Sequence, residues 1–244
     1  MIALIDYGAG NLTSVKKALA AVGAEVFVPV RKEELTAARG IIVPGVGHFG
    51  ATRALGDAWV GAIRTRVDEG CPLLGICLGM QWLYESSDEA PELKGLGVLP
   101  GRVVRLKPAA PYENSGTVVG SGSSRTSADQ EGASGSSRTS ADEEGASGFS
   151  RTSTIKIPHV GWNSLAIVRD DAVIAGVASG AQVYYTHSYV APITGDTAAT
   201  TEHGEPFAAI VQRGHVAGVQ FHPEKSGDVG LQVLRNFLLL TSNV

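Results

Sequence analysis

The chain has 244 residues and a formal net charge of −4, with 43% hydrophobic and 18% charged residues, a composition typical of a globular protein. Its mild acidity argues against nucleic-acid binding, which needs a clustered basic surface. No apolar run reaches the roughly 18 residues of a membrane span, and the first residues resemble a strand rather than a signal peptide. The two cysteines exclude a disulfide scaffold and favour a reducing, cytoplasmic setting. We expect no metal, because no two of the six histidines have the helical spacing of a zinc site.

Predicted strands and helices alternate in the first half of the chain. Apolar runs predict strands at 1–6, 24–30, 40–45 and 72–76. Helical spacing of apolar residues predicts helices at 12–23, 32–38, 57–69 and 78–86. Such alternation indicates a parallel sheet that is covered by helices on both faces.

The second half of the chain is richer in strands. Alternating or apolar segments joined by short turns predict strands at 101–106, 181–190, 197–202, 206–213 and 214–221, followed by a closing helix at 230–241. The fold class we predict is therefore α/β, a single domain with a mixed, largely parallel central sheet flanked by helices.

One segment departs from this pattern. Residues 122–134 and 135–147 are near-identical 13-residue repeats, and a third copy stops at 153. Of the 42 residues at 112–153, 12 are Ser and 7 are Gly. Because such a composition buries too little apolar surface to offset its ordering entropy, we expect a disordered acidic loop inserted into the domain. The repeats are either a phosphorylation or docking array or an expansion without a role, and we favour the second.

The sharpest local signal is the sequence GICLG at 75–79, where an apolar strand passes into a helix. A nucleophile between two glycines at such a turn is strained and exposed at the carboxyl edge of the sheet. The N-terminus of the following helix favours a thiolate. Cys77 is therefore the candidate nucleophile, whereas Cys71 has no such turn and is expected to be a buried structural residue.

A candidate base lies far downstream, in the sequence HPE at 222–224. In an extended segment residues i and i+2 face the same side, so that the His222 imidazole and the Glu224 carboxylate can meet. In this interpretation Cys77 attacks, His222 transfers the proton and Glu224 orients the imidazole. HPE alone is a weak signal, but its combination with GICLG is strong.

A glycine-rich turn, PGVG at 44–47, follows the third predicted strand and leaves backbone N–H groups free to bind an anion. Gly45, Gly47 and Gly50 also match the spacing of a dinucleotide-binding fingerprint. That fingerprint belongs at the first strand–helix turn and needs an acidic residue at the end of the next strand. Both conditions fail here, so we favour an oxyanion-binding turn over a nucleotide site.

The motifs GICLGMQ, FHPE and PGVG together resemble the class I (triad) glutamine amidotransferases. DYGAGNLTSV, PGVGHF, PHVGWN, THSY and FHPEKS further resemble the glutaminase subunits of imidazole glycerol phosphate synthase. The similarity covers 1–111 and 154–244, and the insert at 112–153 departs from it. The chain is then one amidotransferase domain, 1–244, interrupted by that insert.

This resemblance implies the hydrolysis of glutamine to glutamate and ammonia without a cofactor. The ammonia passes to a cyclase subunit, the partner in a heterodimer, which makes imidazole glycerol phosphate and AICAR in histidine biosynthesis. By similarity, the oxyanion hole takes the N–H groups of Val46 and Leu78. Glutamine would be bound by Gly47, Gln81, His187, Ser188 and Tyr189. The residues that would contact the cyclase are Asn11, Trp162, Tyr184 and Lys225.

Other interpretations stay open from the sequence alone. The chain could be a glutaminase feeding a different synthase, a stand-alone cysteine hydrolase of the same fold, or a scaffold that uses the repeats. His187, Ser188 and Tyr189 could be an ordinary half-buried strand, Lys225 a surface charge, and Trp162 a core residue. We also hypothesise that the single chain is nearly inert if the Val46 peptide points away from the oxyanion until the partner binds.

Overall fold

The computed structural model describes residues 1–107 and 155–243. The predicted disordered insert at 112–153 lies outside these residues. Within the described residues no helix has the length and apolarity to cross a membrane.

An eight-stranded sheet forms the centre of the fold, in the order β2-β1-β3-β4-β13-β12-β11-β8. In that order the strands are Val26–Phe27, Ile2–Leu4, Gly40–Val43, Leu73–Ile76, Val216–Val219, Glu205–Arg213, Thr197–His203 and Ala166–Ile167. Neighbours from β2 to β13 pair in parallel, whereas β12, β11 and β8 pair antiparallel. The predicted mixed, largely parallel sheet is confirmed.

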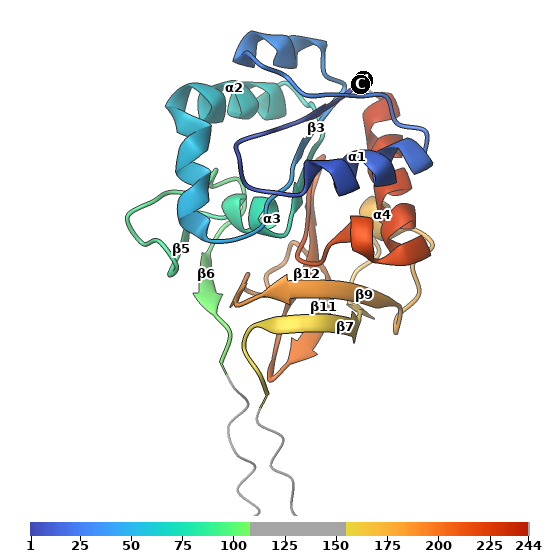
Figure 1. The fold of residues 1–244 in the computed structure, drawn as a ribbon. Coiled ribbons are helices and arrows are strands. Elements are labelled where there is room, and N and C mark those ends of the chain that lie inside the picture. Colours follow the sequence, from blue (N-terminus) through green and yellow to red (C-terminus); the bar gives the residue numbers. More distant parts are fainter. Residues whose placement is uncertain (108–154, 244) are drawn as a thin grey trace, which may run out of the picture. The chain divides into compact units, whose positions relative to one another are not determined.

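Helices cover both faces of this sheet (Figure 1). On one face lie α1 (Leu12–Ala21) and α4 (Gly227–Leu240), and on the other lie α2 (Gly56–Asp68) and α3 (Leu78–Trp82). The central strands are apolar throughout because successive side chains pack on opposite faces: Ile42 joins the core under α1 and α4, and Ile41 joins the core under α2 and α3. Short 3₁₀ helices occupy Lys32–Ala37, Phe49–Leu55, Ala172–Ile174, Pro223–Lys225 and Thr241–Asn243.

Two smaller sheets flank the main one. β5 (Ser86–Ser87), β6 (Arg102–Arg105) and β10 (Tyr189–Val190) form a three-stranded sheet. β7 (His159–Ser164) and β9 (Gln182–His187) form an antiparallel pair and lie side by side in Figure 1.

Four predicted elements differ from the observed ones. The strand predicted at 24–30 is only Val26–Phe27, and the helix predicted at 32–38 is a 3₁₀ helix at Lys32–Ala37. The helix predicted at 78–86 ends at Trp82, because the chain returns and satisfies the helix carbonyls from outside: the Leu96 N–H donates to Trp82 O at 2.6 Å. The strand predicted at 181–190 is interrupted at Ser188, where the chain leaves its pairing with β7 and pairs with β6 instead.

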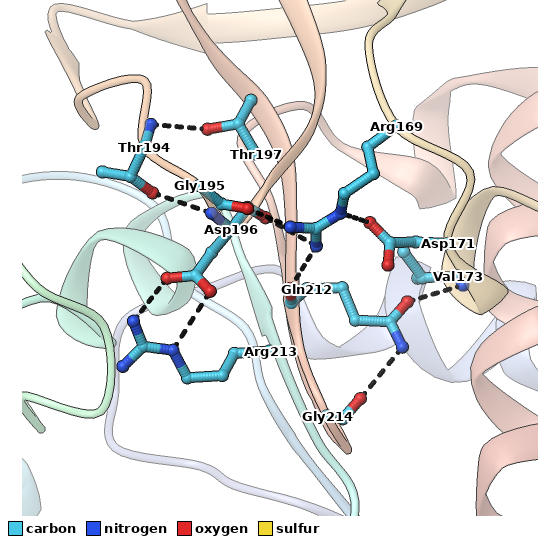
Figure 2. A network of polar contacts seen from close by, with 10 residues as sticks. All are labelled: Arg169, Asp171, Val173, Thr194, Gly195, Asp196, Thr197, Gln212, Arg213 and Gly214. Carbon is cyan, nitrogen blue, oxygen red and sulfur yellow. Dashed lines mark hydrogen bonds and ion pairs between the residues drawn. The ribbon is translucent and has the colours of Figure 1, made fainter.

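A polar network fastens the antiparallel half of the sheet (Figure 2). The Arg169 guanidinium forms an ion pair with Asp171 at 2.7 Å and donates to the backbone carbonyls of Gly195, Asp196 and Gln212. The Gln212 side chain accepts from Val173 N at 2.8 Å and donates to Gly214 O at 2.9 Å. Because the Arg169 and Gln212 side chains supply hydrogen-bond partners to backbone groups, we assign this network a role in stabilising the fold.

The short helix α3 packs its backbone directly on the sheet. A Cβ atom added at Gly79 would lie 1.8 Å from the Val43 carbonyl oxygen, and one added at Gly75 would lie 2.5 Å from the Gly79 carbonyl oxygen. Only glycine permits this approach, which brings the start of α3 against the ends of β3 and β4.

We therefore expect Gly79→Ala to destabilise the protein by about 3 kcal/mol, since a backbone carbonyl cannot yield as a side chain can. For a chain of this size that is a fall of about 6–12 °C in the thermal unfolding midpoint. The matched control is Gly61→Ala within α2, where an added Cβ meets nothing within 4 Å. That change should leave the midpoint unaltered or raise it. Equal midpoints for the two variants would contradict this packing.

Candidate active site

Three neighbouring parallel strands deliver the candidate site residues to one edge of the sheet. Directly after β3 comes the turn 44–47, directly after β4 comes Cys77, and β13 is followed within three residues by His222. The registers pair Val43 with Gly75 and Ile76 with Val219, so the three strands end side by side. The carboxyl edge of a parallel sheet is where ligands bind in open α/β folds.

Cys77 occupies a strained turn between β4 and α3. Its φ of 52° is the only positive value of a non-glycine residue within the described part of the chain. Its N–H donates to Val219 O at 2.7 Å, and its carbonyl accepts from Gln81 N at 3.1 Å. Strain of this kind at the N-terminus of a helix is typical of a nucleophile elbow. Cys71 is 1% exposed, and burial raises the pKa of its thiol, as expected for a structural cysteine.

His222 and Glu224 form a buried pair. His222 Nδ1 lies 2.9 Å from Glu224 Oε1, and their side chains are 1% and 3% exposed. The extended geometry expected for HPE is wrong: only His222 is extended, and Pro223–Lys225 form a 3₁₀ turn closed by Lys225 N donating to His222 O at 3.0 Å. The turn, which Pro223 starts with a fixed φ, still brings the two side chains together.

The charges around His222 favour its protonated form. Burial alone lowers the pKa of the imidazole, but the Cys77 sulfur and the Glu224 carboxylate outweigh burial and raise that pKa to about 10. Nε2 of His222 is buried and has no hydrogen-bond partner among residues 1–107 and 155–243. That nitrogen is therefore available to a reacting group beside the sulfur.

Ser226 holds the backbone of His222 in place, a role that the sequence did not suggest. Its hydroxyl donates to His222 O at 2.6 Å and accepts from Tyr184 N at 2.9 Å, while His222 N donates to Tyr184 O at 2.9 Å. Strand β9 is thereby fastened to the turn that carries the base.

A cavity of about 250 Å³ opens beside the Cys77 sulfur, a size suited to a small polar molecule. It is lined by Gly47, Cys77, Leu78, Gln81, Glu89, Pro158, Thr186, His187, Ser188 and Tyr189. The structure thus brings together all five residues assigned to glutamine by resemblance. Glu89, which the sequence did not suggest, adds a carboxylate whose Oε2 accepts from Phe49 N at 2.7 Å.

The predicted oxyanion donors are not both free. Leu78 N–H donates to Gly45 O at 3.3 Å. The turn 44–47, which was expected to supply the second oxyanion donor, therefore occupies the first donor instead. Tyr7 packs against this turn, since a Cβ on Gly45 would lie 2.2 Å from its hydroxyl oxygen. Burial, and secondarily the charge of Cys77, raise the pKa of Tyr7. Tyr7 therefore lies close to both Cys77 and the turn.

A chain of rings supports the far wall of the cavity. His187 Nδ1 donates to Tyr189 O at 3.0 Å, which leaves its Nε2 to accept from His159 Nδ1 at 3.0 Å. Burial, followed by the neighbouring imidazoles, lowers the pKa of His187 to about 3 and that of His159 to about 4. Both rings are therefore neutral at neutral pH and act as directional hydrogen-bond links. No group of three metal-ligating side chains occurs in the described ranges.

The residues matched to the partner surface lie outside the core. Trp162 is 57% exposed, which excludes its interpretation as a core residue, and it meets Tyr184 edge to face with ring centroids 6.0 Å apart. Lys225 Nζ lies 5.7 Å from the centre of the Tyr184 ring. Asn11, also exposed, caps α1 by accepting from Ser14 N at 3.2 Å.

Comparison with known proteins agrees with this arrangement. The family profile "Glutamine amidotransferase class-I" matches residues 3–240. A protein of Moorella thermoacetica named "Imidazole glycerol phosphate synthase subunit HisH" is 40% identical, with 97% of this chain and 93% of the relative aligned. Proteins of the same name from Geobacillus kaustophilus and Methanothermobacter thermautotrophicus are 40% and 35% identical, covering 98% of this chain and 96% and 98% of the relatives.

Solved structures share the fold. One described as "Crystal structure of glutamine amidotransferase" superposes with a TM-score of 0.64 at 22% identity, covering 99% of this chain and all (100%) of the other. "Structure of PurLQS from Thermotoga maritima" gives 0.63 at 15% identity, covering 98% and 97%. The chain belongs to the class-I glutamine amidotransferases and, within them, to the HisH subunits of imidazole glycerol phosphate synthase.

Proposed function

We propose that the chain hydrolyses glutamine with a Cys77–His222–Glu224 triad and supplies the ammonia to a cyclase subunit in histidine biosynthesis. The observation that carries this proposal is a strained cysteine in the wall of an amino-acid-sized cavity, close enough to the buried His222 imidazole for its sulfur to raise the pKa of that ring. Glu224 lies 2.9 Å from the same imidazole. The proposal treats 1–111 and 154–244 as one amidotransferase domain that acts in the cytoplasm.

The reaction follows from the charges. The Cys77 thiolate attacks the γ-carboxamide carbon, and the resulting oxyanion is bound by the N–H groups of Leu78 and Val46. The His222 imidazolium gives its proton to the amide nitrogen of the intermediate; the C–N bond breaks, ammonia departs and a γ-glutamyl thioester remains on Cys77. Neutral His222 then takes a proton from water, the hydroxide attacks the thioester, and glutamate is released. Glu224 holds the imidazole in place and stabilises its charge.

Substrate binding is assigned to the cavity walls. Gln81 donates its amide N–H groups to Tyr189 O at 2.9 Å and to Gln220 Oε1 at 3.1 Å, which leaves its oxygen to accept from the substrate. Glu89 offers a carboxylate for the α-ammonium group. Gly47, His187, Ser188 and Tyr189 form the rest of the surface around the amino-acid end.

The oxyanion hole supports regulation by the partner. Because Gly45 O takes the Leu78 N–H in the single chain, the turn 44–47 must move before that donor can serve the reaction. One oxyanion donor is worth about 2.7–4 kcal/mol in other enzymes, so a closed hole leaves the chain nearly inert. Binding of the cyclase to the surface formed by Asn11, Trp162, Tyr184 and Lys225 would open it.

Cys77→Ala should reduce glutamate release by the complex at least about 10³-fold, since no other group replaces the nucleophile. The complex should still use free ammonium for cyclisation, because only the source of ammonia is lost. Cys71→Ala, the matched control, should keep both activities. Glutamate release that survives Cys77→Ala would refute the triad.

Glu224→Gln tests the electrostatics of the base. The pKa of His222 is about 10, so the imidazolium persists through neutral pH and the rate should fall only as pH rises through about 10. Without the carboxylate, burial lowers that pKa and the alkaline limb should move to lower pH, with a loss of about 10²–10⁴ in kcat at pH 8. The pH profile of glutamate release measures both effects. Glu25→Gln, at an exposed site, is the control; an unshifted limb in Glu224→Gln would contradict the assignment.

Trp162→Ala should weaken binding of the cyclase about 30-fold or more, as for an exposed aromatic anchor. Glutamate release at limiting cyclase should fall in parallel, and saturating cyclase should restore it, since the triad is untouched. Titration of the chain with cyclase measures both quantities. Val30→Ala, 83% exposed shortly after the outermost strand β2, is the control. A chain that hydrolyses glutamine alone at the rate of the complex would instead be a stand-alone hydrolase.

A further inference from the structure

Gln220 is a fully buried amide that lies between β13 and His222, and the mechanism above gives it no chemical role. Its backbone N–H donates to Ala209 O at 2.9 Å, so the backbone is already satisfied by β12. Its side chain joins two groups of the active site. Oε1 accepts from Gln81 Nε2 at 3.1 Å, and Nε2 donates to the Cys77 sulfur at 3.7 Å.

The direction of these hydrogen bonds is set by a backbone carbonyl. Tyr189 O can only accept, so the Gln81 atom 2.9 Å from it is the amide nitrogen. The Gln220 atom that meets the same nitrogen must be its oxygen. The NH₂ group of Gln220 is therefore turned towards Cys77, and it can donate to the sulfur but cannot accept a proton from it.

We propose that Gln220 is a positioning residue for glutamine hydrolysis, which holds the Cys77 sulfur as a thiolate and fixes the orientation of Gln81 in the cavity. A hydrogen bond donated to a charged group favours the charged form, and the effect is larger in a buried site. Because Gln220 cannot take the proton, it does not compete with His222 as the base. This inference rests on the proposed role of Cys77 as the nucleophile.

A glutamine with a purely structural role would also be buried and hydrogen-bonded. The test therefore needs a measured quantity that does not change when only the stability of the fold changes. Iodoacetamide supplies one: the thiolate sulfur displaces iodide and forms a carbon–sulfur bond, and the rate follows the thiolate fraction. Alkylation of Cys77 in the full chain is followed by mass spectrometry of the peptide that contains it, as a function of pH.

Gln220→Met removes the donor and the acceptor while keeping a similar side-chain volume. We expect the midpoint of the alkylation profile to rise by about one to two pH units, so that alkylation below the midpoint is about tenfold to hundredfold slower. In the complex with the cyclase, the KM for glutamine should also rise, because Gln81 loses a hydrogen-bond partner. The matched control is Gln212→Met, which removes the buried amide of Figure 2 and should leave the midpoint unchanged.

A measurement on the unaltered chain does not depend on the folding of a variant. The side-chain amide resonances of Gln220, assigned through its backbone, should shift with the same pH midpoint as the alkylation rate. An unchanged midpoint in folded Gln220→Met, or amide resonances that do not respond to pH in the unaltered chain, would overturn the role of Gln220. If the complex of the unaltered chain with the cyclase keeps its glutaminase activity after Cys77 is alkylated, the nucleophile assignment fails instead.

Discussion

The active site depends on the parallel pairing of β13 with β4. The register sets Ile76 opposite Val219. The hydrogen bond from Cys77 N to Val219 O at 2.7 Å continues this pairing into the strained turn at Cys77. Side chains alternate along a strand, so a slip of one residue would turn Phe221 towards the sulfur and His222 into the core. Cys77 and His222, the proposed nucleophile and base, lie far apart in the sequence and are brought to the same site because two apolar strands pair in one register.

Burial then determines the chemistry. The buried groups near the Cys77 sulfur are the Gln220 amide, which donates to it, and the His222 imidazole, which is paired with Glu224. The imidazole is charged because the effects of the Cys77 sulfur and the Glu224 carboxylate on its pKa outweigh the effect of its burial. Ser226 ties this turn to Tyr184, whose own ring stands beside the exposed Trp162. His222 N also donates directly to Tyr184 O at 2.9 Å, so the surface proposed for the cyclase is one hydrogen bond away from His222.

The sequence predicted the elements that carry a strong pattern. Apolar runs marked the buried parallel strands because both faces of those strands are covered, and the glycines around Cys77 marked the elbow because only glycine permits the approach of α3 to Val43. The 3₁₀ turn at 223–225 was not predicted, since it depends on how the chain packs on β9. The early end of α3 has a similar cause, because a returning segment satisfies its carbonyls.

The roles of several site residues could not be predicted from the sequence. Glu89 and Gln220 belong to no motif, and Ser226 ends the FHPEKS motif without an assigned role. Each acquires its role only from tertiary neighbours: the cavity for Glu89, the Cys77 sulfur for Gln220 and the strand β9 for Ser226. The occupied Leu78 N–H left no local signal either, because it depends on the conformation of the turn 44–47; a closed oxyanion hole was expected only as a hypothesis about regulation. Tertiary contacts, not local propensity, decide these features.

The central claim is that the sulfur of Cys77 attacks the side chain of glutamine. A chloroketone analogue of glutamine tests it most directly, because the attacking thiolate displaces chloride and stays bonded to the ligand. In the complex with the cyclase, we expect one adduct per chain, located on Cys77, slowed by glutamine and accompanied by proportional loss of glutamate release. An adduct on another residue, or full glutaminase activity with Cys77 modified, would contradict the account.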